Sequence, residues 1–199
     1  MNSYAHSYTE ADTLIGAALA PMDWTRSVSL VVAFSLLTAL AAQIAIPIGP
    51  VPITGQTFAV LLTGALLGSR LGAMAMIVYL AEGASGLPFF YGGHGGISHI
   101  LGATGGYLVA FPAAAFVTGA FAENGWDKRF PAAVVAMAVG SAIIIFVGWA
   151  WLSQFMAPAV AFHAGVRPFI IGDIVKIFLA AAVLPSGWLL LKRKASSKT

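Results

Sequence analysis

The sequence predicts an all-α membrane protein with six transmembrane helices and both termini in the cytoplasm. Three observations support this fold class: the composition, the lengths of the apolar runs and the distribution of the basic residues. Hydrophobic residues make up 59% of the 199 residues, charged residues make up 9%, and the mean hydropathy is +0.90. A water-soluble globule of this size could not bury so much apolar surface, so the chain is predicted to lie in a membrane.

Six apolar runs are candidates for the membrane spans. A helix needs about 20 apolar residues to cross about 30 Å of hydrocarbon. The second and third runs are shorter, so either neighbouring loop residues complete them or they cross only in part. The runs cover residues 27–47, 56–68, 71–84, 106–122, 130–156 and 169–191.

Most of the basic residues fall on one side of the membrane if all six runs cross it. Only Arg167 falls on the other side, and Lys176 lies within the last span. The positive-inside bias then predicts a cytoplasmic N-terminal tail (residues 1–26), a transmembrane domain (27–193) and a basic cytoplasmic C-terminal tail (194–199). The residues on the cytoplasmic side are Arg26, Arg70, Lys128, Arg129, Lys192, Arg193, Lys194 and Lys198.

The N-terminal tail has no basic residue before Arg26, so the positive region of a secretory signal is missing. A short helix on the membrane surface is an alternative for part of this tail. The chain has no Cys, which excludes disulfides and thiolate metal sites.

A glycine-rich segment, residues 86–107, separates the third and fourth apolar runs and carries no Lys or Arg. So many glycines argue against a regular helix and allow backbone amides to approach a ligand closely. Irregular backbone beside a membrane persists only where protein or a water-lined cavity satisfies its amide groups. We therefore expect this segment to build or cover a ligand pocket near the extracellular side.

Asp173 and Lys176 are an acid and an amine within the last span. Their i, i+3 spacing puts both head groups on one face of a helix. Because each lone charge costs about 2.5 to 3.5 kcal/mol near the bilayer centre, both are expected to face the bundle interior. A structural ion pair between helices is the alternative to a binding role. Glu82, near the end of the third span, is expected at the solvated interface.

The connection over residues 46–57 contains three prolines and two glycines. Proline bars a regular helix, so this segment is predicted to be extended and to dip toward the bundle. Thr54, Gln56 and Thr57 are candidates for hydrogen bonds to a ligand. Either threonine could instead cap the following helix.

An ordered set of motifs resembles the biotin-specific S components of energy-coupling factor (ECF) transporters, the BioY family. The resemblance runs over roughly residues 30–190, and its order makes it specific, whereas each glycine motif alone is weak. The motifs are Pro-Ile-Thr-Gly-Gln-Thr from residue 52, Gly-Leu-Pro-Phe from 86, Gly-Gly-His-Gly-Gly from 92, Gly-Ala-Thr-Gly-Gly-Tyr from 102 and Gly-Asp-Ile-Val-Lys from 172.

The resemblance implies a substrate-capture component in the bacterial cytoplasmic membrane that binds biotin from outside and passes it inward by toppling. It also implies three partners: a transmembrane coupling subunit and two ATPase subunits. The chain lacks a Gly-x-x-x-x-Gly-Lys-Ser/Thr phosphate-binding loop, which agrees with an external energy source. Biotin would be the transported ligand, so no cofactor and no catalytic residue are expected.

By this resemblance, Asp173 accepts a hydrogen bond from a ureido N–H of biotin and Lys176 donates to the ureido carbonyl. Aromatic side chains would cover the ring, and loop amides would hold the tail. The residues also allow the reverse orientation, with Lys176 on the carboxylate. The candidate substrate-binding residues are Asp173, Lys176, Tyr91, Phe90, Thr54, Gln56, Gly93, His94, Gly95, Gly96 and Thr104.

Small residues in the first span suggest a face for docking a partner helix. Ser35, Ala39 and Ala42 recur at i, i+4 and i+7, and such flat faces allow close approach in lipid. The family is said to dock through an Ala-x-x-x-Ala face, for which Ala41 and Ala45 also compete. Packing within the chain's own bundle is the alternative.

Other functions are less compatible with the sequence. His94, His99 and His163 lie in outer loops, but nothing fixes their separation, so no metal site is predicted. A membrane-embedded enzyme would need a nucleophile and base or a His-Glu-x-x-His motif, and the sequence has neither arrangement. Capture of another small vitamin is the closer alternative. The pI near 9.4 reflects the sorting of basic residues by topology, so no nucleic acid partner is expected.

Overall fold

The computed structural model describes residues 13–19 and 22–196, with side chains described as far as Leu191. Its N-terminal half contains α1 (Leu14–Leu19), α2 (Trp24–Gln43), β1 (Ala45–Ile46), β2 (Ile53–Thr54), α3 (Gln56–Leu67) and α4 (Ser69–Ala84). Then follow η2 (Tyr91–Gly93), α5 (Ile97–Ile100), α6 (Gly105–Glu123), η3 (Trp126–Lys128), α7 (Phe130–Leu152), α8 (Pro158–Gly165) and α9 (Phe169–Ser196), η denoting a short 3₁₀ helix.

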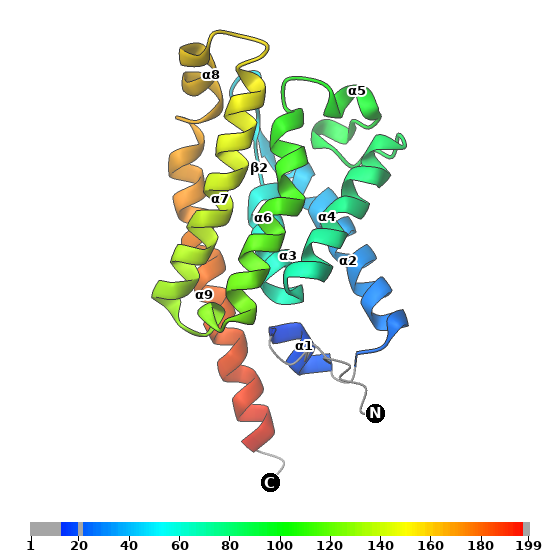
Figure 1. The fold of residues 1–199 in the computed structure, drawn as a ribbon, viewed down its shortest axis with the longest axis vertical. Helices are drawn as coiled ribbons and strands as arrows, with labels where there is room; N and C mark the ends of the chain where they lie inside the picture. Colours follow the sequence, from blue (N-terminus) through cyan, green and yellow to red (C-terminus); the bar gives the residue numbers. More distant parts are fainter. Residues whose placement is uncertain (1–12, 20–21, 197–199) are drawn as a thin grey trace, which may run out of the picture.

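The long helices form a bundle in which α3 contacts α2, α4, α6 and α9 (Figure 1). The short helix α1 and the C-terminal end of α9 lie at one end of the bundle, and α5 and α8 lie at the other. Among the described residues, four helices are long and apolar enough to cross a membrane: α2, α6, α7 and α9. The predicted helical membrane protein is thereby confirmed, with α3 (12 residues) and α4 (16 residues) as shorter helices of the same bundle.

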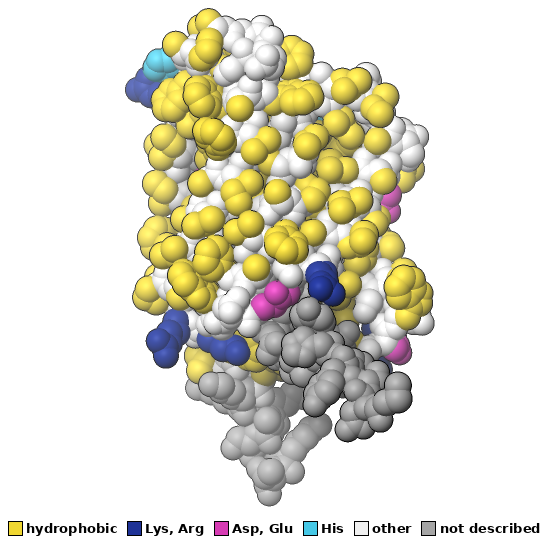
Figure 2. All heavy atoms as spheres, viewed as in Figure 1, with side chains coloured by type: hydrophobic (Ala, Val, Ile, Leu, Met, Phe, Trp, Pro, Cys, Tyr) yellow, Lys and Arg dark blue, Asp and Glu magenta, His cyan; other side chains and the backbone are white. Residues whose placement is uncertain are grey.

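The outer surface of the bundle is apolar, as expected for helices that face lipid. Figure 2 shows hydrophobic side chains along one face of the bundle, with Lys and Arg side chains mainly toward the end where α1 lies and also beside a His at the opposite end. Large apolar side chains such as Leu40, Phe146 and Ile171 are 69%, 65% and 77% exposed. A water-soluble protein would not leave so continuous an apolar surface open.

Small residues bring the central helices unusually close together. A Cβ atom on Gly64 of α3 would lie 2.2 Å from the Ala115 carbonyl of α6, and one on Gly119 of α6 would lie 2.3 Å from the Ser69 amide of α4. Helices in lipid associate through such close packing because no hydrophobic drive acts between them. The buried core of the bundle therefore depends on glycine and alanine at the crossings.

Several boundaries differ from the sequence predictions. The first long helix begins at Trp24, inside the predicted tail of residues 1–26, because Asp23 caps it by accepting from the Arg26 amide at 2.7 Å. Within that tail α1 packs against α3 and α9, and residues 1–12 lie outside the described part. At the other end, α9 continues to Ser196, into the predicted C-terminal tail.

The connection predicted as extended and the segment predicted as irregular both contain short regular elements. The proline-rich connection forms an antiparallel hairpin in which Ala45 pairs with Thr54 and Ile46 with Ile53, so the fold is not purely helical. The glycine-rich segment contains η2 and α5. Gly92, Gly93 and Gly96 have φ of 70°, 72° and 93°, a backbone conformation that favours glycine, which explains their density here.

Candidate functional site

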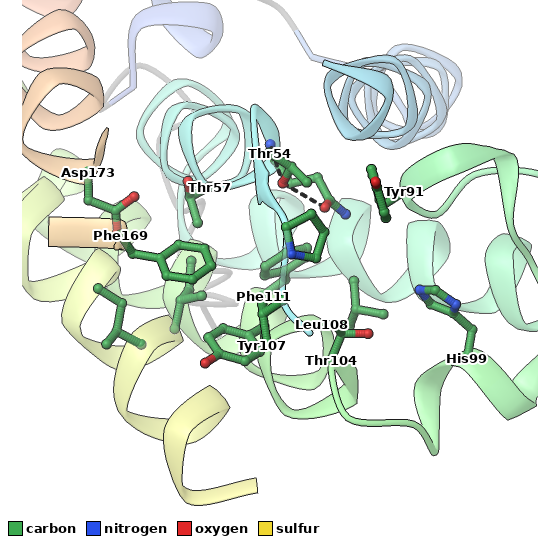
Figure 3. Close-up of a pocket in the computed structure, with 15 residues that line it drawn as sticks. Thr54, Thr57, Tyr91, His99, Thr104, Tyr107, Leu108, Phe111, Phe169 and Asp173 are labelled. Carbon is green, nitrogen blue, oxygen red and sulfur yellow. Dashed lines mark hydrogen bonds between the residues drawn. The ribbon is translucent and has the colours of Figure 1, made fainter. Parts of the chain in front are cut away.

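A cavity opens between the hairpin, the glycine-rich segment and the adjacent ends of α3, α6, α7 and α9 (Figure 3). Its empty space, opening included, is about 560 Å³. The walls are largely apolar, and the rings of Tyr107 and Phe169 stack there with centroids 5.9 Å apart. Besides Tyr107, the polar side chains that line it are Thr54, Gln56, Thr57, Tyr91, His99, Thr104 and Asp173.

Asp173 lies at one end of this cavity and His99 at the other (Figure 3). The Asp173 side chain is held from two sides: Ser141 of α7 donates to Oδ2 at 2.6 Å, and Lys176 Nζ lies 3.2 Å from Oδ1. Asp173 is only 4% exposed. Each oxygen keeps a second acceptor position, so the carboxylate can accept a hydrogen bond from a guest in the cavity.

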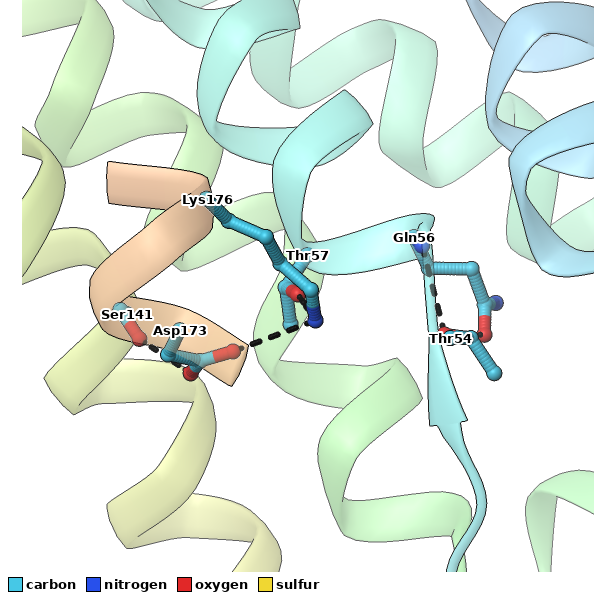
Figure 4. A network of polar contacts seen from close by, with 6 residues as sticks. All are labelled: Thr54, Gln56, Thr57, Ser141, Asp173 and Lys176. Atoms are coloured by element: carbon cyan, nitrogen blue, oxygen red, sulfur yellow. Dashed lines mark hydrogen bonds and ion pairs between the residues drawn. The ribbon is translucent and has the colours of Figure 1, made fainter. Parts of the chain in front are cut away.

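Lys176 reaches from α9 to α3, where its Nζ donates to Thr57 Oγ1 at 2.7 Å as well as to Asp173 (Figure 4). Asp173 and Thr57 line the cavity, whereas Lys176 is not among its lining residues. The predicted pair therefore exists and faces the bundle interior. Its amine contacts two groups that line the cavity, Asp173 and Thr57.

Thr54 and Gln56 both line the cavity, and their side chains are hydrogen-bonded to each other. Thr54 donates to Gln56 Oε1 at 2.8 Å, and Gln56 Nε2 donates to the hydroxyl of Tyr79 at 2.7 Å. The Tyr79 hydroxyl in turn donates to the Phe89 carbonyl at 3.1 Å. The cavity wall is thus connected to the glycine-rich segment. Gly55 is the N-cap residue of α3, but Thr54 Oγ1 also accepts from the backbone amide of Gln56, the first residue of the helix, at 3.3 Å, so Thr54 bonds to the helix start as the alternative predicted.

Of the predicted residues in the glycine-rich segment, Tyr91 and Thr104 line the cavity and the rest do not. Phe90 is fully buried beneath it, with its ring edge against Tyr79 at 5.7 Å between centroids. Its carbonyl accepts from Gln43 Nε2, and Gln43 Oε1 accepts from the Gly93 amide, both at 3.1 Å. Phe90 therefore anchors the segment to α2. A ligand tail was predicted to contact four residues that do not line this cavity: Gly93, His94, Gly95 and Gly96.

His99 takes the place at the cavity that the sequence suggested for His94. The His99 ring lies between the Phe90 ring (5.1 Å between centroids) and the His94 ring (5.6 Å). Burial, and then the neighbouring His94, lower the pKa of His99 below its ordinary value of 6.5. In the part of the chain that the structure describes, no three His, Cys, Asp or Glu side chains come together as a metal site would require.

Comparison with known proteins identifies the family. A sequence model of the BioY family matches residues 9–193, which is most of the chain. The chain belongs to the BioY family.

Relatives and a solved structure agree with this membership. A protein of Pyrococcus horikoshii described as a probable biotin transporter BioY is 44% identical over 158 residues, 79% of this chain and 93% of the relative. The biotin transporter BioY of Thermotoga maritima is 37% identical over 152 residues, 75% of this chain and 88% of the relative. A crystal structure of the S component for biotin from an ECF-type ABC transporter has a TM-score of 0.74 at 27% identity, and covers 81% of this chain and 90% of that one.

The face predicted to dock a partner lies inside the bundle of this BioY protein. Ser35, Ala39 and Ala42 are 0%, 7% and 0% exposed. Ser35 donates to Glu82 Oε2 of α4 at 2.7 Å, and Glu82 stays partly exposed near the end of that helix. These small residues serve close packing of α2 against α3 and α4, which was the alternative. The prediction of a docking face at these residues is wrong because burial leaves it no surface.

Sequence reasoning missed several residues of the cavity. Tyr107, Phe111 and Phe169 form much of its wall, and Ser141 holds Asp173 from behind. Tyr107 ends the glycine-rich motif and Phe169 begins the last span, so aromatic residues at span ends were an available signal. Ser141 gave no such signal, because a lone serine inside an apolar run usually bonds its own helix.

Proposed function

We propose that this BioY protein is the substrate-capture component of a biotin transporter, which binds biotin from the extracellular side and passes it inward with an ATP-driven ECF module. The observation that carries the proposal is the cavity, whose apolar walls end at one buried carboxylate, Asp173. Biotin combines a flat ureido head, an apolar ring and a tail with a carboxylate. A mostly apolar pocket with a few placed polar groups suits such a guest.

The proposed topology has six crossings, with α3 and α4 as the short ones. Twelve residues of α3 span only about 18 Å at 1.5 Å per residue. The hairpin can complete that crossing, because Val51 between its strands is 4% exposed and irregular backbone at membrane depth is tolerated when protein surrounds it. An even number of crossings is consistent with α1 and the end of α9 lying together (Figure 1). The basic residues favour the cytoplasm for that end.

In the proposed pose, biotin lies along the cavity with its two polar groups at opposite ends. The ureido head lies at Asp173, which accepts one of its N–H groups. The carboxylate lies at the other end, where Tyr91, His99 and Thr104 can donate hydrogen bonds. The apolar ring lies between them against Tyr107 and Phe169. The reverse pose would put a carboxylate against Asp173, and the repulsion between like charges disfavours it.

The proposed partners are a transmembrane coupling subunit and two ATPase subunits. The ECF-type ABC transporter of the similar crystal structure supports this context. Since Ser35, Ala39 and Ala42 are buried, the open face of α2 with Leu36, Leu37 and Leu40 is the better candidate for docking. Membership of a transporter family also excludes the enzyme alternative.

Equilibrium binding of labelled biotin to the purified protein tests the proposal. We expect saturable binding that unlabelled biotin displaces and that other vitamins, such as thiamine and riboflavin, do not. Binding of another vitamin in place of biotin would identify a different substrate. Absence of biotin binding by a monodisperse, folded preparation would refute the proposal. Uptake by cells with and without the ATPase subunits would then test the energy source.

A further inference from the structure

Thr57 differs in its hydrogen bonds from the other buried threonines that lie inside helices. Thr38, Thr63 and Thr118 each donate to the carbonyl four residues earlier, at 2.9, 2.7 and 2.9 Å. This is the ordinary bond of a threonine in an apolar helix. Thr57 is the second residue of α3, and the residue four places earlier is Ile53 of the hairpin. No described residue accepts a hydrogen bond from Thr57.

The Thr57 oxygen is nevertheless occupied. Lys176 Nζ lies 2.7 Å from Thr57 Oγ1. An ammonium group has only donors, so the hydroxyl oxygen must accept this bond. The hydroxyl hydrogen is then left for another acceptor, and Thr57 lines the cavity (Figure 3). A hydroxyl that accepts from a cation is also polarised as a donor, because bonds in a chain strengthen one another.

We propose that the Thr57 hydroxyl, polarised by Lys176, donates the hydrogen bond to the ureido carbonyl oxygen of biotin. This inference rests on the proposed function and refines it, because it replaces Lys176 with Thr57 as the group that contacts the carbonyl. Lys176 acts as a positioning residue, which orients Thr57 and Asp173 through its contacts with both. Thr57 is 8% and Asp173 4% exposed, so both bonds form away from bulk water.

The arrangement matches one edge of a urea. Asp173 offers an acceptor and Thr57 a donor, and the shared contact with Lys176 brings them together (Figure 4). A ureido group presents an N–H donor beside its carbonyl acceptor, so the two pairs are complementary. A ligand head without a strong acceptor beside its N–H would leave the Thr57 hydrogen unpaired, which disfavours its binding.

The test compares biotin with 2-thiobiotin, in which sulfur, a weaker acceptor, replaces the ureido oxygen. Binding of both ligands is measured for the wild type, T57S and the nearly isosteric T57V. We expect the wild type and T57S to prefer biotin by at least tenfold, and T57V to lose most of this preference. T63V is the matched control, because Thr63 is a buried threonine of the same helix that does not line the cavity, and it should keep the preference.

The outcomes separate the inference from the proposed function. If the wild type does not bind biotin, the inference and the proposed function are both refuted. If it binds biotin but T57V keeps the preference, or if the wild type does not distinguish the two ligands, only the inference is overturned. Loss of the preference in K176M while T57V retains it would assign the contact to Lys176 directly. Should T57V fail to fold, T57C is used instead, because its thiol is a weak donor of similar size.

Discussion

Replacement of Asp173 by Asn removes the one negative charge among the described residues that line the cavity, while nearly preserving the side-chain volume. In the proposed pose the carboxylate accepts a hydrogen bond from a ureido N–H of biotin. A hydrogen bond to a charged group contributes about 1.5 to 3 kcal/mol. Since about 1.4 kcal/mol corresponds to a tenfold change, D173N should weaken biotin binding by roughly 10-fold to 150-fold.

The same substitution also affects the protein without ligand. Lys176 would lose its carboxylate at 3.2 Å and keep Thr57, and Ser141 would face an amide in place of a carboxylate oxygen. Removing one partner of a buried pair costs about 3 to 5 kcal/mol. The free energy of unfolding should therefore fall, and binding must be measured at a temperature where the variant is folded.

Isothermal titration calorimetry with purified protein separates the two effects, because it also reports the fraction of binding-competent protein. The matched control is D127N, since Asp127 is a buried carboxylate (2% exposed) in η3 that is not part of the cavity. It should bind biotin like the wild type. A D173N protein that is fully competent and binds biotin within twofold of the wild type would refute the assignment of Asp173 to the ureido head.

Three further predictions concern the walls and packing of the site. Y79F removes the bonds that connect Gln56 with the Phe89 carbonyl, so biotin should dissociate several-fold faster, as measured by stopped flow. G119A places a Cβ 2.3 Å from the Ser69 amide and should lower the free energy of unfolding by more than about 1 kcal/mol, measured by thermal melting in detergent. The protection factors of amides in the glycine-rich segment, which are the exchange rates corrected for the intrinsic rate at each pH, should fall as the pH falls below about 6.5, because the folded segment disfavours protonation of His99.

Each of these predictions has a control and a contradicting result. For Y79F, an unchanged dissociation rate would show that the hydroxyl does not hold the segment. For G119A the control is G172A, whose Cβ would meet Ile53 at an ordinary 3.6 Å, and equal melting temperatures would contradict the packing argument. The sign of the pH effect follows from the pKa of His99, which the folded segment lowers below 6.5. Protonation of His99 therefore favours the unfolded segment, and the stability of the folded segment is lost as the pH falls from about 6.5 toward the lowered pKa. A pH dependence that persists in H99Q would assign it to another group.

The sequence by itself determined the class of the protein and singled out the acid and amine that form an ion pair in the last span. Composition and run length require a membrane environment, because apolar surface on this scale has no other stable place. Asp173 and Lys176 could be singled out because a charge inside an apolar span is costly and must be compensated. The ordered glycine and proline motifs indicated the family for a different reason. Backbone that cannot be helical is constrained by the groups that it contacts.

Only the tertiary structure decided which groups meet. Thr57 and Lys176 are 119 positions apart, and Ser141 and Asp173 are 32 apart, so no local pattern relates them. The same holds for Ser35, Ala39 and Ala42, whose spacing predicts a close helix contact but not whether the contact lies inside the chain or with a partner. Helical periodicity fixes which residues share a face, whereas the rotation of each helix in the bundle decides whether that face meets lipid, a neighbouring helix or the cavity.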